Sequence, residues 1–295
     1  MFRNYLKTAW RNLVKNKFYS AINIAGLTLG LTVGMLILLW IQDEYSYDSF
    51  HKNAGNIIKL ENMVGTNASR QLWTSTTAPI GVSAKEQIPG VKEVVRITGN
   101  DFYALYKYND KSFTDERNVF TDASFFTMFK GPVVEGNAFN PFPDNYSVVI
   151  TETTAQKFCG SADAIGKIIT ADDSAHFKVT GVIKDLPKNS DIRGDMFFPM
   201  SLLAQKRYVG NTDGKNISND YAQFNFDTYL LIQPGFSFDG FAKKLRDIHL
   251  SVKPDDTDID YVWLPLEKVH LYHSDGSEGG AGKVRMFMMI AVLIL

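Results

Sequence analysis

Cysteine, net charge and early acidic residues are all scarce in this sequence of 295 residues. The single cysteine, Cys159, excludes a scaffold held together by disulfides. The formal net charge is only −1, so the composition gives no support for a nucleic-acid partner. A hydrophobic content of 45% excludes intrinsic disorder, and the length is sufficient for a sizeable core.

The first 42 residues contain no acidic residue at all. They carry five basic residues, whereas the rest of the chain carries 26 basic and 32 acidic residues. A basic segment joined to an acidic body indicates two different environments, and the residues between them identify the boundary.

Charge is also absent from residues 21–41, which read AINIAGLTLGLTVGMLILLWI. As a helix these 21 residues extend about 31 Å, close to the ~30 Å hydrocarbon core of a bilayer. A buried helix of a soluble core seldom needs so long an uncharged run. A cleaved signal peptide would be shorter, and the following IQDEYSYD lacks a cleavage pattern. The run predicts an uncleaved transmembrane helix, assigned to residues 19–42.

The flanking charges predict the orientation of this helix. All five early basic residues precede it, and Asp43, Glu44 and Asp48 follow it, so the N-terminus is expected in the cytoplasm. Apolar and basic positions alternate at helical spacing over residues 1–18, which predicts an amphipathic cytoplasmic helix resting on an anionic membrane surface. A plain basic flank is the alternative. The predicted basic face consists of Arg3, Lys7, Arg11 and Lys15.

Three glycines in the apolar run, Gly26, Gly30 and Gly34, recur every four residues. This spacing puts them on one face of a helix, where their small size lets another helix approach closely. One pair at this spacing would mean little, because glycine is frequent in membrane helices. The double repeat predicts a face that packs against a partner helix.

The sequence ends in a second apolar stretch, in which Lys283 and Arg285 lead into MFMMIAVLIL. Ten residues extend only about 15 Å as a helix, half of a bilayer core. Residues 284–295 are therefore interpreted as the start of a second, truncated transmembrane helix in a multi-pass protein. The two basic residues would lie outside, against the usual charge bias, but the first helix usually dominates the orientation.

Residues 43–283 are expected to form an outer α+β domain, with a division into two subdomains left open. Patterns typical of strands occur at 91–97, 147–151, 177–183, 228–232 and 261–264, and helical patterns at 80–88, 152–159 and 238–250. Because strands and helices do not alternate strictly, the order favours α+β over a parallel α/β fold. Proline and glycine clusters predict loops at 131–143, 187–199 and 274–282.

No catalytic, cofactor-binding or metal-binding set of residues is recognisable in this domain. The segment GSADAIGK at 160–167 has the wrong spacing for a phosphate-binding loop, and Ile168 replaces the hydroxyl residue that would hold magnesium. His270 and His273 could share a helix face as metal ligands, but no carboxylate pattern accompanies them. Cys159 is interpreted as a small core residue. Without a Walker motif, the chain is not expected to be an enzyme.

Five short stretches form an ordered set: TAWRNLVKNKFYSAINIAGLTLGL (8–31), DEYSYDSFHKNAGNI (43–57), VVITETTAQKFCG with IGK (148–167), VTGVIKDLPKNS (179–190) and KVHLYHSDG (268–276). Together they resemble the MacB/FtsX-type permeases of ABC transporters and their MacB-like periplasmic core domain. The resemblance covers the whole chain in order. Departures at 58–60, at Cys159 and in DIRGDMFFPM (191–200) concern what the outer domain would recognise.

The resemblance implies a permease subunit of the bacterial inner membrane, paired with a separate or fused cytoplasmic ABC ATPase. It also implies a homodimer or pseudo-dimer, contact with membrane lipid, and scope for a periplasmic or outer-membrane partner. Such permeases pass ATP-driven movement to a periplasmic domain, a process called mechanotransmission. No cofactor is implied.

A membrane-anchored extracytoplasmic sensor is the alternative hypothesis, because an outer domain of about 240 residues between two spans also suits receptor kinases. Further spans after residue 295 would favour the permease, and a signalling domain after one completed span would favour the sensor. The basic amphipathic start and the ordered motifs favour the permease.

Overall fold

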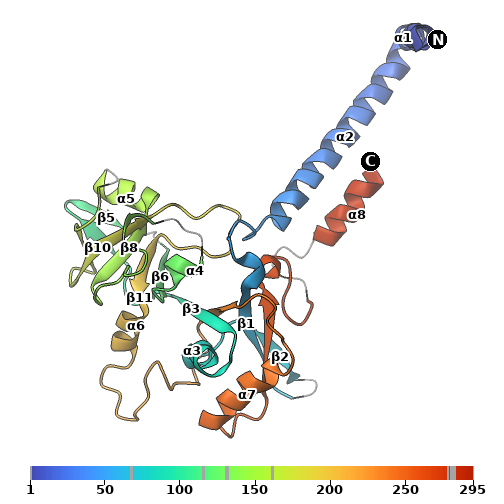
Figure 1. Cartoon of the computed structure of the whole chain (residues 1–295). Coiled ribbons are helices and arrows are strands. Elements are labelled where there is room, and N and C mark those ends of the chain that lie inside the picture. Colours follow the sequence, from blue (N-terminus) through green and yellow to red (C-terminus); the bar gives the residue numbers. More distant parts are fainter. Residues whose placement is uncertain are drawn as a thin grey trace.

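A computed structural model of the chain describes residues 2–66, 69–114, 117–129, 133–160, 163–277, 279 and 284–294. Figure 1 shows a long helix that leads from the N-terminal end into a mixed body of strands and helices. The helix projects from this body instead of packing into it. The chain thus has two structurally distinct parts.

The long helix, α2 (Lys17–Tyr45), contains the whole uncharged run 21–41. Most of its apolar side chains are exposed, and it is the one helix in the described part of the chain that is long and apolar enough to cross a membrane. A core helix of a soluble protein would bury such residues, because exposed apolar surface is unfavourable in water. The predicted N-terminal apolar helix is confirmed.

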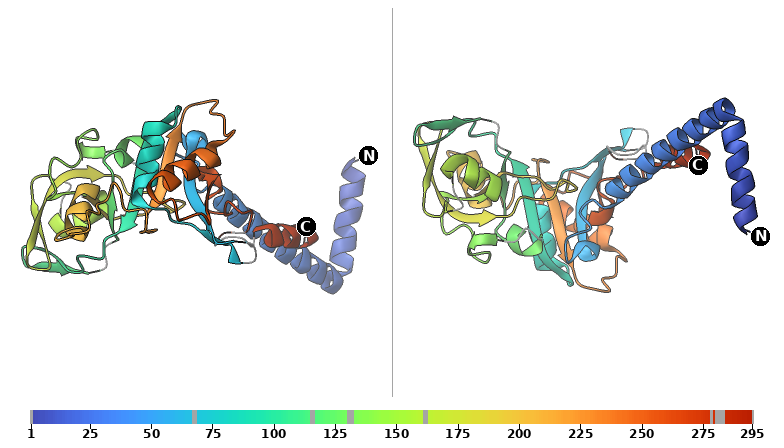
Figure 2. Two further views of the ribbon diagram at one scale, coloured as in Figure 1. Left: turned by 90° about the horizontal axis from the view of Figure 1, so that it is seen from below. Right: turned by 90° about the horizontal axis from the view of Figure 1, so that it is seen from above.

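A shorter helix, α1 (Phe2–Lys15), precedes α2 and turns sharply away from it, as Figure 2 shows. The break falls at Asn16, whose φ of −109° and ψ of 54° lie outside the helical region. Asparagine competes with the backbone for hydrogen bonds and is a weak helix former, which suits this position. The helix predicted at the N-terminus is therefore present.

The helix α8 (Val284–Ile294) runs beside the C-terminal half of α2. The rings of Trp40 and Phe287 meet edge to face, with their centroids 4.9 Å apart. The second apolar stretch is thus helical where it is described. Lys283 and Leu295, which the sequence prediction included, lie outside the described residues.

The described strands of the body belong to one sheet, in the order β13-β1-β12-β3-β6-β11-β8-β10-β9-β4-β5, with β2 beside β1 and β7 beside β10. Two neighbouring pairs, β6 with β11 and β8 with β10, are parallel, and the other pairs are antiparallel. This mixture confirms the α+β class. The bounds are β1 (Ile57–Val64), β2 (Gln71–Trp73), β3 (Val91–Gly99), β4 (Tyr106–Tyr108), β5 (Lys111–Phe113), β6 (Asn118–Thr121), β7 (Val133–Gly136), β8 (Ser147–Thr151), β9 (Ile168–Ala171), β10 (Ala175–Ile183), β11 (Met196–Pro199), β12 (Asp227–Ile232) and β13 (Ile259–Pro265).

The sheet has two halves, each with its own helices and core. The half made of β13, β1, β12 and β3 packs against α3 (Ala78–Gln87) and α7 (Phe241–Val252). Residues 100–226 leave this half after β3 and return at β12, and they carry α5 (Glu152–Cys159) and α6 (Met200–Arg207). A third, phenylalanine-rich cluster around α4 (Phe125–Met128) joins the halves. The insertion is therefore a second packing unit on a continuous sheet.

Several predicted elements match the observed ones closely. The strand predicted at 147–151 is β8, and the helix predicted at 152–159 is α5. Gly160 ends α5 with a φ of 68°, a conformation that glycine adopts without steric cost. The other predicted strands and helices correspond to β3, β10, β12, β13, α3 and α7.

Two of the predicted loops are wrong in part. The segment 187–199 ends in β11, whose four residues are all buried, and 131–143 contains β7. Proline and glycine near these strands hide them from local pattern analysis, whereas β11 is held between β6 and β8. Strand β1, which lies between β12 and β13, had no strand prediction either. Residues 131 and 132 lie outside the described part, and 274–276 form a turn as predicted.

Candidate functional site at the membrane junction

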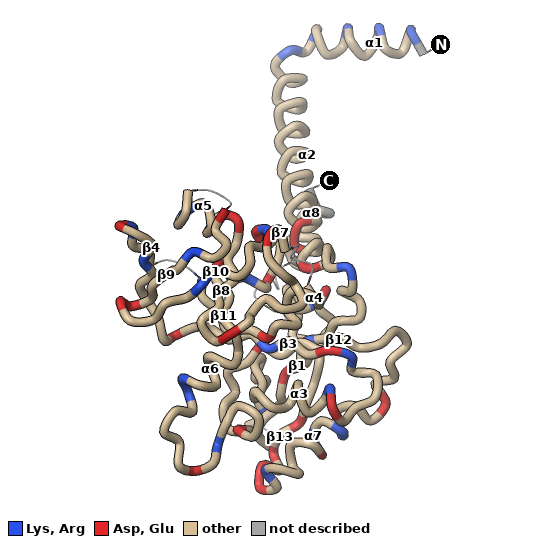
Figure 3. The backbone as a smooth tube through the Cα atoms, turned by 60° about the vertical axis from the view of Figure 1, so that its left-hand side comes forward, with Lys and Arg blue, Asp and Glu red and all other residues tan. Residues whose placement is uncertain are grey.

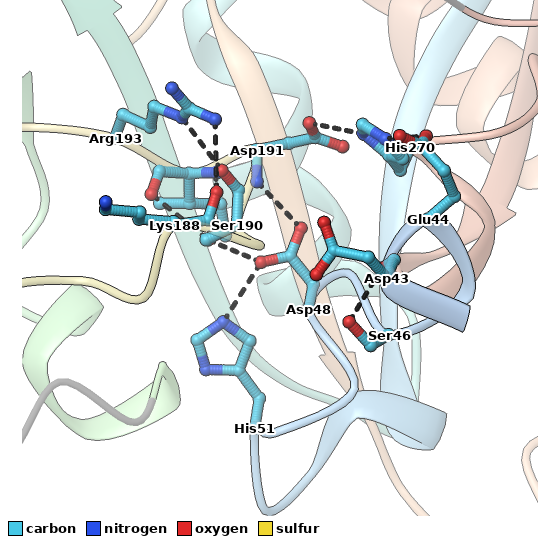
Figure 4. A network of polar contacts seen from close by, with 11 residues as sticks. Asp43, Glu44, Ser46, Asp48, His51, Lys188, Ser190, Asp191, Arg193 and His270 are labelled. Carbon is cyan, nitrogen blue, oxygen red and sulfur yellow. Dashed lines mark hydrogen bonds and ion pairs between the residues drawn. The ribbon is translucent and has the colours of Figure 1, made fainter. Parts of the chain in front are cut away.

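Three segments far apart in the sequence meet where α2 enters the body. They are the end of α2 with residues 46–51, the loop 188–193, and the segment 270–274 that precedes α8. Figure 4 shows their polar side chains pointing toward one another. We call this set the membrane junction. It is the place where a movement of the apolar helix would reach the sheet.

His270 binds two of these segments at once. Its Nε2 atom lies 2.8 Å from a carboxylate oxygen of Glu44 on α2, and its Nδ1 atom lies 2.8 Å from a carboxylate oxygen of Asp191. Tyr47 stacks on the imidazole, with ring centroids 3.4 Å apart. A protonated imidazole can donate to both carboxylates, whereas the neutral ring can donate to only one. This bridge connects the helix end, the loop and the segment before α8.

Asp48 makes a second connection just below the end of α2. Its buried carboxylate accepts hydrogen bonds from Ser190 Oγ at 2.5 Å and from the backbone N–H of Asp191 at 3.1 Å. His51 Nε2 lies 3.5 Å from the same carboxylate. The φ of Asp48 is 52°, in the left-handed region that aspartate tolerates better than most residues. A buried charge held in this way fixes the direction of the chain after the helix.

The loop 188–193 is closed onto the helix end by further hydrogen bonds. The backbone N–H of Asp48 donates to Asn189 O at 3.0 Å, and Asn189 Nδ2 donates to Ser46 Oγ at 2.9 Å. Arg193 braces the loop from within, because its guanidinium donates to the carbonyls of Ser190 and Lys188. Hydrogen bonds therefore hold the loop 188–193 against residues 46–48.

Apolar contacts continue the junction toward the membrane. Ile41 on α2 and Leu271 are buried together, and Trp40 and Tyr272 pack against them. On the other side, the buried carboxylate of Glu61 on β1 accepts hydrogen bonds from the backbone N–H and the hydroxyl of Ser274. The segment 270–274 thus links the end of α2 directly to the sheet.

Electrostatics at the junction favour a neutral phenol between the charged groups. Burial raises the pKa of Tyr47 above its usual value, and the negative charge of Glu44 adds to the shift. A neutral ring can stack on the imidazole of His270 without bringing a further negative charge beside the two carboxylates.

His270 and His273, which were considered above as metal ligands, face different partners. His270 faces Glu44 and Asp191, whereas Nδ1 of His273 lies 3.8 Å from Glu61. Within the described residues, no group of three or more histidine, cysteine or acidic side chains is placed to hold a metal ion. Cys159 packs against the core of the inserted half, where burial raises the pKa of its thiol.

The residues predicted from the sequence as a site lie elsewhere. The basic face of α1 is exposed at the far end of α2 from the body, where Figure 3 shows the blue positions along the helix. Gly34 is buried, Gly30 is half-buried, and a side chain at Gly26 would meet nothing within 4 Å. The structure brings neither set to the junction.

The junction residues were missed because no local pattern pairs them. Glu44 and Asp48 belong to one of the family-like stretches, and His270 belongs to another. Those stretches were the only available signal, since Glu44 and His270 are 226 positions apart. Even so, the stretches at 43–57, 179–190 and 268–276 converge here.

Comparison with known proteins gives a consistent result. The family model described as "MacB-like periplasmic core domain" matches residues 20–248. Among curated proteins, the macrolide export ATP-binding/permease protein MacB of Marinobacter nauticus is 26% identical over 223 residues, covering 72% of this chain and 34% of that protein. The chain therefore spans about a third of the length of the curated relative that it matches.

One solved structure supports the fold. A domain ascribed to a permease protein of Porphyromonas gingivalis superimposes with a TM-score of 0.61 at 18% identity, covering 80% of this chain and 99% of that one. The periplasmic region of MacB from Actinobacillus actinomycetemcomitans is more distant, with a TM-score of 0.49 and 15% identity over 73% of this chain and 91% of that one.

Proposed function

The chain belongs to the family of the MacB-like periplasmic core domain, and we propose that it is part of an ABC transporter permease that couples cytoplasmic ATP hydrolysis to motion of this domain. Family membership supports a membrane protein with a periplasmic segment. The proposal adds that the protein is a multi-pass protein of the bacterial inner membrane, and that export or envelope remodelling is the outcome.

The membrane junction is the observation that carries this proposal. A continuous helix of 29 residues, α2, ends in the Glu44–His270–Asp191 bridge and the buried Asp48. Because the bridge also reaches β1 through Ser274 and Glu61, a tilt of α2 would pull on the sheet instead of being absorbed by a loose linker. We infer that the junction transmits the movement as a rigid-body displacement.

We propose that a partner ATPase supplies the force at the other end of α2. The basic face of α1, made by Arg3, Lys7, Arg11 and Lys15, is exposed and well placed for anionic lipid beside such a partner. ATP binding would have to favour one of two arrangements of the assembly, since a ligand shifts an equilibrium only by its differential affinity.

We also propose a homodimer or pseudo-dimer in which α2 contacts a second span. Because Gly34 is buried and Gly30 is half-buried, the open part of the glycine face is centred on Gly26 and extends to Gly30. This proposal divides the chain into a cytoplasmic helix, a first span, an outer domain and the start of a second span, at 1–18, 19–42, 43–283 and 284–295. It treats the two halves of the body as subdomains of the outer domain.

The decisive experiment measures domain motion in the assembled transporter. Spin labels on β13 of the two outer domains would report their separation with and without ATP, in the full protein reconstituted with its ATPase. We expect Glu44→Gln combined with Asp191→Asn to reduce the ATP-dependent change in distance at least about threefold, because amides cannot hold His270 by charge. ATP hydrolysis itself should continue.

The matched control is Glu93→Gln, which breaks the exposed Lys85–Glu93 ion pair far from the junction. It should leave both ATP hydrolysis and domain motion unchanged, because exposed pairs contribute little. Full domain motion in the junction double variant would contradict the proposal.

A further inference from the structure

The inserted half of the sheet contains a cavity. It lies between α6, the start of β10 and the segment before β4, and has a volume of about 430 Å³. This volume lies within the range of small-molecule sites in proteins. Its lining includes Tyr103, Tyr146, Ser174, Gln205 and Lys206. None of these residues takes part in the membrane junction.

One part of the cavity wall is aromatic and aliphatic. Tyr103 is buried and packs edge to face against Phe177, with centroids 5.3 Å apart, so its ring is held rigidly. Tyr146 also contacts Phe177, but about half of its surface remains exposed. Leu202 forms the apolar side that belongs to α6. A flat apolar group could therefore pack against a preformed surface.

A cation without a carboxylate partner stands over this surface. The ammonium of Lys206 lies 5.0 Å from the centroid of the Tyr103 ring, and no carboxylate pairs with it in the described part of the chain. Lys206 is exposed and supplies the positive charge at the cavity, since the aromatic face beneath it only partly replaces an anion.

Further hydrogen-bonding groups surround the same cavity. Gln205 accepts from Asn145 at 2.9 Å through Oε1, which leaves its amide nitrogen as a donor. Ser174 adds a hydroxyl to the rim. The buried Tyr103 hydroxyl has no hydrogen-bond partner among the described residues.

Nearby carboxylates do not cancel this positive character. Asp172 accepts hydrogen bonds from the backbone N–H groups of Ala104 and Leu105, and Asp173 pairs with Lys107. Their charges are thus occupied by other donors, and the cavity retains one cation above an aromatic floor.

We propose that this cavity binds a small organic anion with a flat apolar body, whose carboxylate pairs with Lys206 while its body packs against Tyr103 and Tyr146. The site is separate from the coupling function proposed above. It would give the outer domain a ligand-binding role of its own, whether or not the junction transmits movement.

Phenylacetate is the probe, and 2-phenylethylamine carries the opposite charge on a similar body. Calorimetric titration of the full chain in detergent should show saturable binding of phenylacetate, with a Kd on the order of 1 mM or tighter for so small a ligand. The amine should not bind, because Lys206 would repel it. Absence of saturable phenylacetate binding, or equal binding of the amine, overturns the proposal.

Three variants locate the binding. Lys206→Gln should weaken phenylacetate binding about tenfold, and Lys206→Arg should restore most of it. Ser174→Trp should abolish binding by filling the cavity, with an unchanged unfolding temperature because Ser174 is exposed. Lys244→Gln is the matched control, since Lys244 lines a separate cavity of about 420 Å³. Loss of binding only in Lys244→Gln would place the site there and overturn the assignment.

Discussion

Two histidines of the body have both ring nitrogens close to partners, but they join different kinds of segment. His249 on α7 lies 2.8 Å from the Tyr261 hydroxyl and 3.0 Å from Asp256, and all three residues fall within 13 positions of the chain. His270 joins Glu44 and Asp191, which lie 226 and 79 positions away. The first cluster fixes a helix on its neighbouring strand, and the second connects the two parts of the molecule.

The two histidines also differ in how deeply they are buried. His249 is completely buried, and burial lowers its pKa, an effect that the nearby Asp256 partly offsets. His270 is partly exposed and faces two carboxylates. A buried local cluster contributes to folding, whereas a partly exposed bridge between segments can change without unfolding either of them. We expect substitutions at the two histidines to separate stability from coupling.

The largest expected effect is on stability. His249→Ala should lower the free energy of unfolding by about 2–4 kcal/mol, because it leaves a cavity and removes a partner from both Tyr261 and Asp256. Chemical denaturation of the full chain in detergent, followed by tryptophan fluorescence, measures the change. His176→Ala is the control, since His176 is exposed and its imidazole lies 3.1 Å from the Thr170 hydroxyl. If His249→Ala lowers the free energy of unfolding by less than about 0.5 kcal/mol, the proposed difference between the two histidines is wrong.

The matching substitution His270→Ala should cost about 1 kcal/mol or less in the same measurement. Its main effect should be on coupling, seen as a smaller ATP-dependent displacement of the outer domain. If His270→Ala destabilises the body as much as His249→Ala, the junction is a folding element like the His249 cluster.

A third test asks whether α8 positions α2 inside the membrane as the junction does outside it. Gly34→Leu should disturb the packing of α2, because Gly34 is buried although most of this helix is exposed, and should reduce disulfide crosslinking between cysteines placed at Trp40 and Phe287. Gly26→Leu should leave that crosslink intact and weaken only association between copies. Equal crosslinking yields in Gly34→Leu and the wild-type chain would show that the small residue is unnecessary.

The smallest effect concerns pH. Because the folded state lowers the pKa of His249 below the usual value of 6.5, the folded chain binds fewer protons than the unfolded chain in this range. This contribution to stability is complete above pH 6.5 and is lost as the pH falls toward the lowered value. Denaturation midpoints at several pH values should show the loss, and His249→Gln should reduce it. An unchanged slope in that variant would assign the loss to other groups.

Local patterns predicted much of the body and none of the junction. The strand at 147–151 and the helix at 152–159 were readable because the strand pattern, the helical pattern and the closing Gly160 all lie within a few residues. The strand β11 could not be predicted from local patterns, since its buried residues are held by β6 and β8 from other parts of the chain. The His270 bridge could not be predicted either, because Glu44 and Asp191 also come from other parts of the chain.

The predicted site residues also combine features that the sequence reveals with features that only packing decides. The basic face of α1 and the spacing of its four positive residues followed directly from the sequence, as did the three glycines of α2. That Gly34 is buried and Gly26 is open could not be predicted, because burial depends on how distant parts of the chain pack. The functions of both faces remain proposals.

The amino-acid order alone determined the apolar helix, the basic segment before it and the α+β character of the body, because these depend on composition and on periodicity over a few turns or strands. Only the tertiary structure decided that Glu44, Asp191 and His270 meet, and that an aromatic cavity forms beneath Lys206. Such meetings arise from packing between distant segments, whose relative placement no local pattern encodes.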